Sequence, residues 1–268
     1  MTSTGPISSR PFLQYLLMFV LFFTIGLGIN KIMGPLKCMG DEKDYHILAH
    51  HLIETGNFGW PGSQANRAPL YPVLIAGVYT IFGEKHYSTD NLNSVTRVMQ
   101  SFLGAIMLLL AFMLAKDLAG KKAGYLTVVF MLFDSYWWMA QYTLMQENIF
   151  SVLILLSFTI LRQAFKNKNN HFKTRIFVAG LIFGLAQLTK PFHLSLFPIL
   201  IGLGVLSCFI SRFHFPTKAA AIFSFAVLLV MAPWTIRNYR VFIPSSLSLL
   251  VVGQDLPPHI ALKPLPLP

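Results

Sequence analysis

Acidic residues stand close together in the sequence GDEKDYHILAHHLIETG, which covers residues 40–56. A carboxylate held beside a hydroxyl group can accept its proton, so Asp41 is a candidate general base and Glu42 a supporting acid. Helical spacing places Asp41, Asp44 and Tyr45 on one face of a predicted helix over residues 41–55. The alternative interpretation is an amphipathic helix that lies on a bilayer with acids in its first turn.

A second face of the same predicted helix carries Glu42, His46 and His50, spaced four residues apart. Three side chains at this spacing can serve as ligands of a metal ion. Histidine also suits a helix at a membrane interface, because its ring is amphipathic. Spacing alone leaves both interpretations open.

Basic residues occur where apolar segments begin or end. Arg67 stands in NRAPLYP, before two prolines and Tyr71, while Lys190 stands in LTKP and Arg237 in PWTIRNYR. Arginine can bind a phosphate through paired hydrogen bonds. Each cation alone is typical of a membrane edge, but together with Arg97 these residues would attract a phosphate group.

Two further acids accompany the apolar segments. Glu147 stands in QENIF at the start of one segment, either as a helix cap or facing a cavity beside Asp41. Asp134 falls within another predicted span, where an ionisable group is costly and indicates a functional role. The aromatic residues at 136–138 are typical of a membrane interface, so Asp134 is expected near the outer headgroups.

The composition is that of a membrane protein. Of the 268 residues, 54% are hydrophobic and 12% are charged, and the mean hydropathy is +0.59. Soluble domains carry about 25% charged residues. The net charge of +11 lies in short islands between apolar segments, which argues against nucleic-acid binding. Cys38 and Cys208 are far apart and indicate no disulfide framework.

Apolar segments long enough to cross about 30 Å of hydrocarbon predict about seven transmembrane helices. They cover roughly residues 11–29, 95–118, 123–141, 148–164, 175–189, 192–210 and 219–235. The segment Leu70–Phe82 is shorter and contains Pro72, so we expect an interfacial or re-entrant helix there. The predicted fold is an all-α polytopic bundle over residues 1–252, followed by a Pro-rich tail without regular structure at 253–268.

Basic residues in short loops predict the orientation. With the N-terminus in the cytoplasm, the segments predicted to lie inside are densely basic and hold one acid, Asp117. Their basic residues are Arg10, Lys116, Lys121, Lys122, Arg162, Lys166, Lys168, Lys173, Arg175, Arg212 and Lys218. The long loop 31–94 is then outside, where a loop of this length is usually functional. The acids and cations above therefore meet on the outer face, which suits transfer of a group from a lipid phosphate.

Six motifs occur in order along residues 10–245: GDEKDYHILAHHLIETG, NRAPLYPVLIAGVYTIFG, TRVMQ, QENIF, GLAQLTKP and APWTIRNYRVF. Together they resemble membrane glycosyltransferases of the GT-C type. More closely, they resemble the superfamily of dolichyl-phosphate-mannose protein mannosyltransferases and aminoarabinose transferases. The resemblance implies a multi-span helical bundle with juxtamembrane helices in the first outer loop.

The resemblance also implies a reaction. A hexosyl or pentosyl group would pass, with inversion, from a polyprenyl or dolichyl monophosphate to a hydroxyl of a protein, lipid or glycan. The site would face out of the plasma membrane, such as a bacterial inner membrane. Asp41 matches the catalytic carboxylate, Glu147 a second outer acid, and Arg67 and Arg237 basic residues of the family. No metal, cofactor or nucleic acid is implied.

Relatives commonly continue for further spans beyond the point where this chain leaves the pattern. We therefore keep a shortened, inactive relative or a non-catalytic membrane protein as the alternative. A transporter or flippase would need polar residues deep in several spans, and Asp134 alone offers that, so this alternative ranks below the others.

Overall fold

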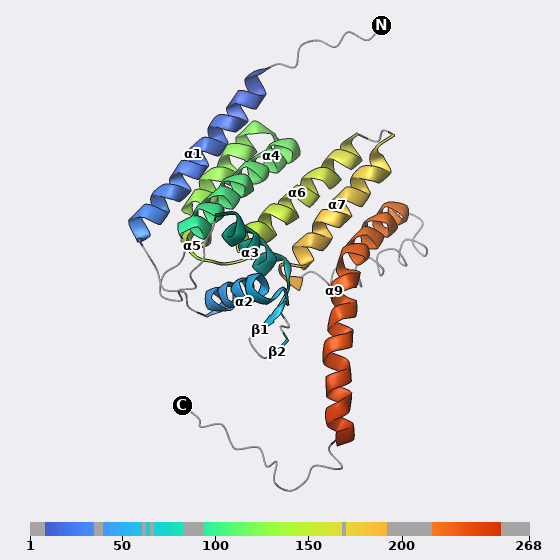
Figure 1. The fold of residues 1–268 in the computed structure, drawn as a ribbon. Helices are drawn as coiled ribbons and strands as arrows, with labels where there is room; N and C mark the ends of the chain where they lie inside the picture. Colours follow the sequence, from blue (N-terminus) through green and yellow to red (C-terminus); the bar gives the residue numbers. More distant parts are fainter. Residues whose placement is uncertain are drawn as a thin grey trace. The chain divides into compact units, whose positions relative to one another are not determined.

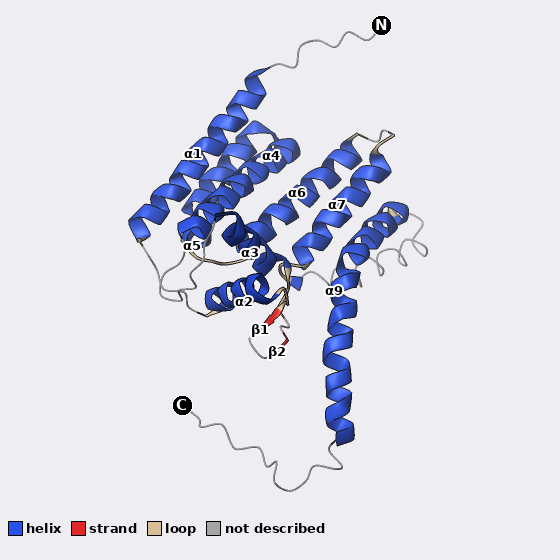
Figure 2. Cartoon of the chain, viewed as in Figure 1, coloured by secondary structure: helices blue, strands red, loops and turns tan. Residues whose placement is uncertain are grey.

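The computed structural model describes residues 9–34, 40–60, 63–64, 67–82, 94–167, 170–191 and 216–252. Helices dominate these residues, and the two short strands β1 (Gly59–Trp60) and β2 (Ser63–Gln64) pair antiparallel (Figure 2). The protein is an all-α membrane protein, as predicted. The predicted span 192–210 and the tail 253–268 lie outside the described residues.

Helices follow one another along the chain (Figure 1). They are α1 (Ser9–Met33), α2 (Asp41–Thr55), α3 (Leu70–Phe82), α4 (Ser94–Phe133), α5 (Ser135–Tyr142), α6 (Glu147–Lys166), α7 (Phe172–Gln187) and α9 (Thr217–Val252). The chain divides into two compact units, Met1–Met231 and Ala232–Pro268, and the boundary falls within α9.

Four helices of the described residues are long and apolar enough to cross a membrane. They contain the segments Phe12–Met33, Val95–Phe133, Glu147–Lys166 and Thr217–Arg240. α7 has 16 residues, and α3 is a short apolar helix of 13 residues, as predicted. The predicted number of about seven spans stays a prediction.

α4 is a helical hairpin rather than one long helix. Its backbone leaves helical geometry at Ala119 and at Gly120, where φ is 86°, a value that glycine adopts without strain. A Cβ added at Gly124 would lie 2.9 Å from the ring of Phe112. Twelve residues of continuous helix would separate these positions by about 18 Å. The chain therefore reverses at Gly120, where the sequence predicts a break between two spans.

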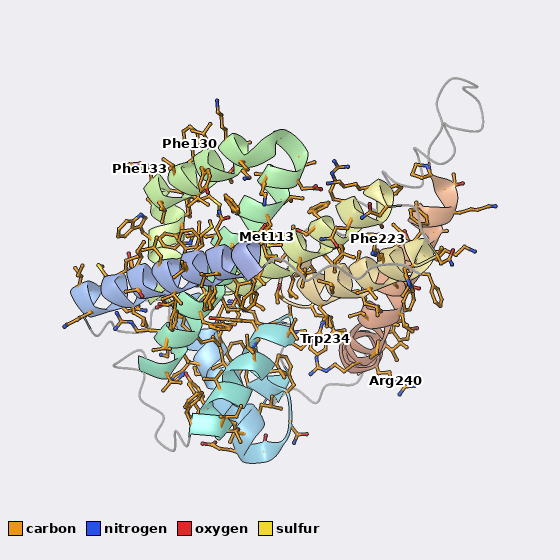
Figure 3. The ribbon with its side chains drawn as sticks, turned by 90° about the horizontal axis from the view of Figure 1, so that it is seen from above. Met113, Phe130, Phe133, Phe223, Trp234 and Arg240 are labelled. Carbon is orange, nitrogen blue, oxygen red and sulfur yellow. The ribbon has the colours of Figure 1, made fainter. Side chains whose placement is uncertain are left out.

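The second arm of α4 ends earlier than predicted. It stops at Phe133, and Asp134 caps the separate helix α5, which begins at Ser135, instead of lying inside a span to residue 141. Phe130 and Phe133 are largely exposed on this arm and point away from the bundle (Figure 3). Exposed aromatic side chains on an apolar helix are what a hydrocarbon environment favours.

Polar contacts join the first arm of α4 to the end of α1. Arg97 is buried and donates to the side-chain oxygen of Asn30 at 3.1 Å and to the backbone oxygen of Gly34 at 2.5 Å. Asn30 in turn donates to the hydroxyl of Ser101 at 2.7 Å. Arg97 therefore satisfies carbonyl groups at the C-terminal end of α1. The prediction that Arg97 forms part of a phosphate-attracting rim is not supported by these contacts.

Two glycines let α7 pack closely on the first part of α9. A Cβ added at Gly180 would lie 2.5 Å from the backbone oxygen of Phe223 and 2.8 Å from the Cβ of Ala226. A Cβ at Gly184 would lie 2.8 Å from the Cβ of Val230. The predicted packing role of this small-residue pair is thus confirmed.

Gly180→Ala is expected to lower the free energy of unfolding by about 1–3 kcal/mol, because the added methyl group meets backbone that cannot rotate away. Thermal unfolding of the purified protein in detergent measures this loss. Gly28→Ala is the matched control, since a Cβ there meets no atom within 4 Å. Equal stability of the two variants would contradict the close packing of α7 on α9.

The first unit of the bundle has two chemically different ends. At the basic end, where α4 reverses and α6 finishes, Asp117 pairs with Arg162 and Lys166. The opposite end is the site end, where α2, the start of α3, the start of α6 and the end of α7 come together. Among the described residues of this unit, Asp117, Arg162 and Lys166, predicted to face the cytoplasm, thus lie at one end, and Asp41, Arg67, Glu147 and Lys190, predicted to face outward, lie at the other.

Candidate functional site

α2 is held at the site end by buried contacts along one side. Tyr45 and Ala49 pack with Tyr71 and Ile75 of α3, and the rings of Tyr45 and Tyr71 meet edge to face at 5.0 Å. The bounds predicted for this helix are confirmed. Its apolar side packs against α3, and the alternative that this helix lies on a bilayer stays a prediction.

Glu42 fixes the start of α2 to the link between α5 and α6. Its side chain is 8% exposed, and its carboxylate accepts a hydrogen bond from the backbone N–H of Leu144 at 3.0 Å. A buried carboxylate with a backbone donor positions the chain. Glu42 therefore acts as a structural support, while its neighbour Asp41 turns outward and is about half exposed.

Arg67 binds both acids on the exposed side of α2. One terminal nitrogen of its guanidinium lies 2.7 Å from an oxygen of Asp41 and 2.5 Å from an oxygen of Asp44. The guanidinium also lies over the ring of Tyr45, 5.7 Å from its centre. The hydrogen bonds that Arg67 donates to Asp41 and to Asp44 raise the pKa of Arg67, against the lowering effect of burial. The structure thus joins a predicted catalytic carboxylate directly to a predicted phosphate ligand.

A second ion pair lies at the same end. Lys190, just after α7, places its ammonium 3.3 Å from the carboxylate of Glu147, the first residue of α6. The backbone N–H of Leu70 donates to the carbonyl of Leu188 at 2.9 Å. This bond ties the start of α3, three residues after Arg67, to the chain that carries Lys190.

The tyrosine pair connects the two charged groups. Burial raises the pKa of Tyr45 to about 12; Arg67 opposes this shift, and Asp41, Glu147 and Asp44 add to it. Burial also raises the pKa of Tyr71, with a further contribution from Glu147. Both phenols stay protonated at neutral pH. They can donate hydrogen bonds at the site but cannot act as bases.

Two buried amides that the sequence analysis did not select support this arrangement. Gln100 donates to the hydroxyl of Tyr71 at 2.8 Å and to the carbonyl of Met145 at 2.6 Å. Asn148 donates to the carbonyl of Ala140 at 2.8 Å and to the side chain of Gln100 at 3.2 Å. The network sets the start of α6, and hence Glu147, against Tyr71. The sequence did contain a signal, because Gln100 ends the motif TRVMQ and Asn148 stands in the motif QENIF.

The remaining predicted residues lie elsewhere. Asp134 is exposed and caps α5 by accepting the backbone N–H of Tyr136 at 3.0 Å, so the structure does not group it with Asp41. Arg237 belongs to the unit Ala232–Pro268, where its guanidinium lies 4.8 Å from the ring centre of Trp234. Its predicted contact with a donor phosphate stays a prediction.

His46 and His50 of α2 contact α3, whereas the ring of His51 lies 3.1 Å from the carbonyl of Asn57. His46 lies 2.6 Å from the hydroxyl of Tyr79, and the ring of His50 lies 5.0 Å from that of Tyr79. Burial lowers the pKa of His50, so its neutral form is favoured. Within the described part of the chain, no three histidine, cysteine or acidic side chains are grouped as metal ligands.

Comparison with known proteins places the chain in a family. The sequence profile of the dolichyl-phosphate-mannose-protein mannosyltransferases matches residues 66–236, which is more than half of the chain. A search of curated proteins and a search of solved structures each found no significant match. Arg67, Glu147 and Lys190 fall within the matched region, whereas Asp41 precedes it and Arg237 follows it. The chain is a member of the dolichyl-phosphate-mannose-protein mannosyltransferase family, whose members are membrane glycosyltransferases.

Proposed function

We propose that the chain transfers a sugar from a polyprenyl or dolichyl monophosphate to a hydroxyl acceptor at the extracytoplasmic face of the plasma membrane. Membership of the family supports sugar transfer from a lipid-linked donor. The observation that carries the residue roles is the contact of Arg67 with both Asp41 and Asp44. It holds a phosphate-binding group and a proton acceptor within one hydrogen bond of each other.

In this reaction, the acceptor hydroxyl attacks the anomeric carbon of the donor sugar as the bond from that carbon to the phosphate oxygen breaks. The lipid phosphate leaves with the bonding electrons, and the configuration at the carbon inverts. Asp41 takes the proton of the hydroxyl. Arg67 and Lys190 stabilise the negative charge that develops on the leaving phosphate.

Donor binding is expected to rearrange the two charged groups. Arg67 and Lys190 are both paired with carboxylates, so a phosphate that binds either cation competes with these partners. A guanidinium has five N–H donors and favours a phosphate held by two of them. As Arg67 turns toward the phosphate, Asp41 loses its cation and becomes a better proton acceptor. Donor binding thereby activates the base.

Membranes from cells that express the full chain test the proposal directly. They would be incubated with radiolabelled sugars on polyprenyl or dolichyl monophosphate, and label in protein and in the lipid or glycan fraction would be measured. We expect label to move to an acceptor from at least one donor and not from the matching nucleotide sugar. Membranes without the chain provide the background. No transfer from any lipid-phosphate sugar, with the chain folded and present, would overturn the proposal.

Asn57 and Asn170 are positions at which to test whether the site end faces out of the cell. Both are exposed, and they lie at the site end and the basic end respectively. In a chain with Cys38 and Cys208 replaced by serine, an impermeant thiol reagent added to intact cells is expected to label Asn57→Cys but not Asn170→Cys. The basic loops should remain in the cytoplasm. The reverse pattern would place the site end inside the cell.

A further inference from the structure

A cavity of about 650 Å³ opens at the basic end, away from Asp41 and Arg67. α1 contributes Tyr15 to it, the first arm of α4 contributes Lys116 and Asp117, and α6 contributes Arg162 and Lys166. Met113 of α4, which is labelled in Figure 3, also lines the cavity. Neither the family nor the proposed transfer reaction assigns a role to this cavity.

The charges that line the cavity are strongly unbalanced. Three cations face one acid, and that acid, Asp117, already pairs with both Arg162 and Lys166. Lys116 donates to the hydroxyl of Tyr15 at 2.9 Å rather than to a carboxylate. The lining therefore keeps a net positive charge after its ion pairs are formed. An anion with several acceptor oxygens could bind the cations that Asp117 only partly neutralises.

The contact between Asp117 and Arg162 is incomplete. The Nε of Arg162 and an oxygen of Asp117 are 3.3 Å apart. Both atoms are buried, and neither makes a hydrogen bond to a described residue. A buried donor and a buried acceptor without hydrogen bonds cost free energy. A ligand oxygen beside Arg162 would satisfy the donor.

The cavity lies at the ends of two apolar helices, where we expect lipid headgroups. Gly120, where α4 reverses, and Asn167, which follows α6, are both part of its lining. Met113 and Leu114 of α4 add apolar side chains to the lining, and Thr159 and Gln163 of α6 add polar ones. A phosphate at the helix ends with hydrocarbon on one side is the arrangement of a membrane phospholipid.

We propose that this cavity binds the phosphate of an anionic membrane lipid, with Arg162, Lys166 and Lys116 as its cations. Asp117 pairs with Arg162 and Lys166, so it competes with the lipid phosphate for these two cations. Tyr15 holds Lys116 at the edge of the cavity, through both the hydroxyl contact and the face of its ring. The site is separate from the proposed transfer reaction and does not depend on it.

Native mass spectrometry of the full chain in detergent tests the proposal. Phosphatidylglycerol, phosphatidylcholine and inorganic phosphate would each be titrated, and bound copies counted. We expect phosphatidylglycerol to bind more tightly than phosphatidylcholine, and inorganic phosphate to bind weakly. The double variant Arg162→Gln/Lys166→Gln should bind phosphatidylglycerol roughly 30-fold more weakly. Each cation near an anionic lipid contributes about a factor of five to the affinity. Lys121→Gln/Lys122→Gln, at the turn of α4, makes the same charge change outside the lining and should alter affinity less than about twofold.

The direction in which Asp117→Asn changes the affinity for phosphatidylglycerol decides whether Asp117 competes with the lipid. If Asp117 competes with the lipid, this variant should bind phosphatidylglycerol several-fold more tightly, a gain that misfolding cannot produce. An unchanged or weaker affinity would mean that Asp117 and its cations only join α4 to α6. If Arg162→Gln/Lys166→Gln and Lys121→Gln/Lys122→Gln lose the same affinity for phosphatidylglycerol, the lipid responds to the general surface charge and not to this cavity. Binding of inorganic phosphate with no preference between the two lipids would overturn the lipid assignment.

Discussion

Asp41→Asn is expected to lower the rate of sugar transfer by about 10²–10⁴-fold, the usual contribution of a positioned general base. The amide keeps the shape of the side chain but cannot take the proton of the acceptor hydroxyl. Affinity for the donor should hold or increase, because Arg67 loses one of its two competing carboxylates. Transfer rates at saturating donor, together with binding of labelled donor, separate the two effects.

Asp44→Asn is the matched control for this change. It also removes one carboxylate from Arg67, but Asp44 is less exposed than Asp41, at 33% against 47% of the side chain. We expect similar donor binding and a rate close to that of the unchanged protein. Glu42→Gln should also keep most of the rate, since an amide oxygen can still accept from Leu144. A larger loss of rate in Asp44→Asn than in Asp41→Asn would move the base to Asp44.

Arg67→Ala is expected to reduce kcat/KM for the donor by about 10²–10³-fold, the usual effect of removing one group that stabilises developing negative charge. The change also leaves Asp41 and Asp44 without the cation between them, so their carboxylates repel an incoming phosphate. Both effects act in the same direction. Initial rates at varied donor concentration measure the loss.

Two other variants show whether the geometry of the guanidinium matters. Arg67→Lys should recover part of the activity, because an ammonium keeps the charge but cannot form two parallel hydrogen bonds to a phosphate. Arg240→Ala removes an exposed arginine in the unit Ala232–Pro268 and should have little effect on the rate. If all three variants retain similar activity, Arg67 only holds α2 in place.

Much of the fold could be predicted because it follows from local sequence. Acids in the first turn and Gly56 after the last one mark the two ends of α2, and Gly56 does adopt the left-handed conformation there. Gly120 sits among basic residues between two apolar segments, and the chain reverses at that position. Turn residues and charge act within a few positions, so their effect is visible without the tertiary structure.

The candidate site was predictable only in part, because its contacts join distant residues. The sequence pointed to Asp41 and Arg67 separately but contained no sign that a single nitrogen would hold two carboxylates. Gln100 and Asn148 lie in apolar segments without any periodic signal, and their role depends on a network across α4 and α6. Asp134 was misplaced for a similar reason. Its capping role depends on where the preceding helix ends, and hydropathy continues across that point.

The backbone hydrogen bond between Leu70 and Leu188 has a mechanical consequence. Arg67 stands three residues before one partner and Lys190 two residues after the other, and Pro69 stiffens the first of these short tethers. The two cations thus form a clamp, because the distance between them can vary only within a limited range. Closing on a phosphate would then require little loss of backbone freedom. Any motion that opens the clamp must carry the start of α3 and the end of α7 together.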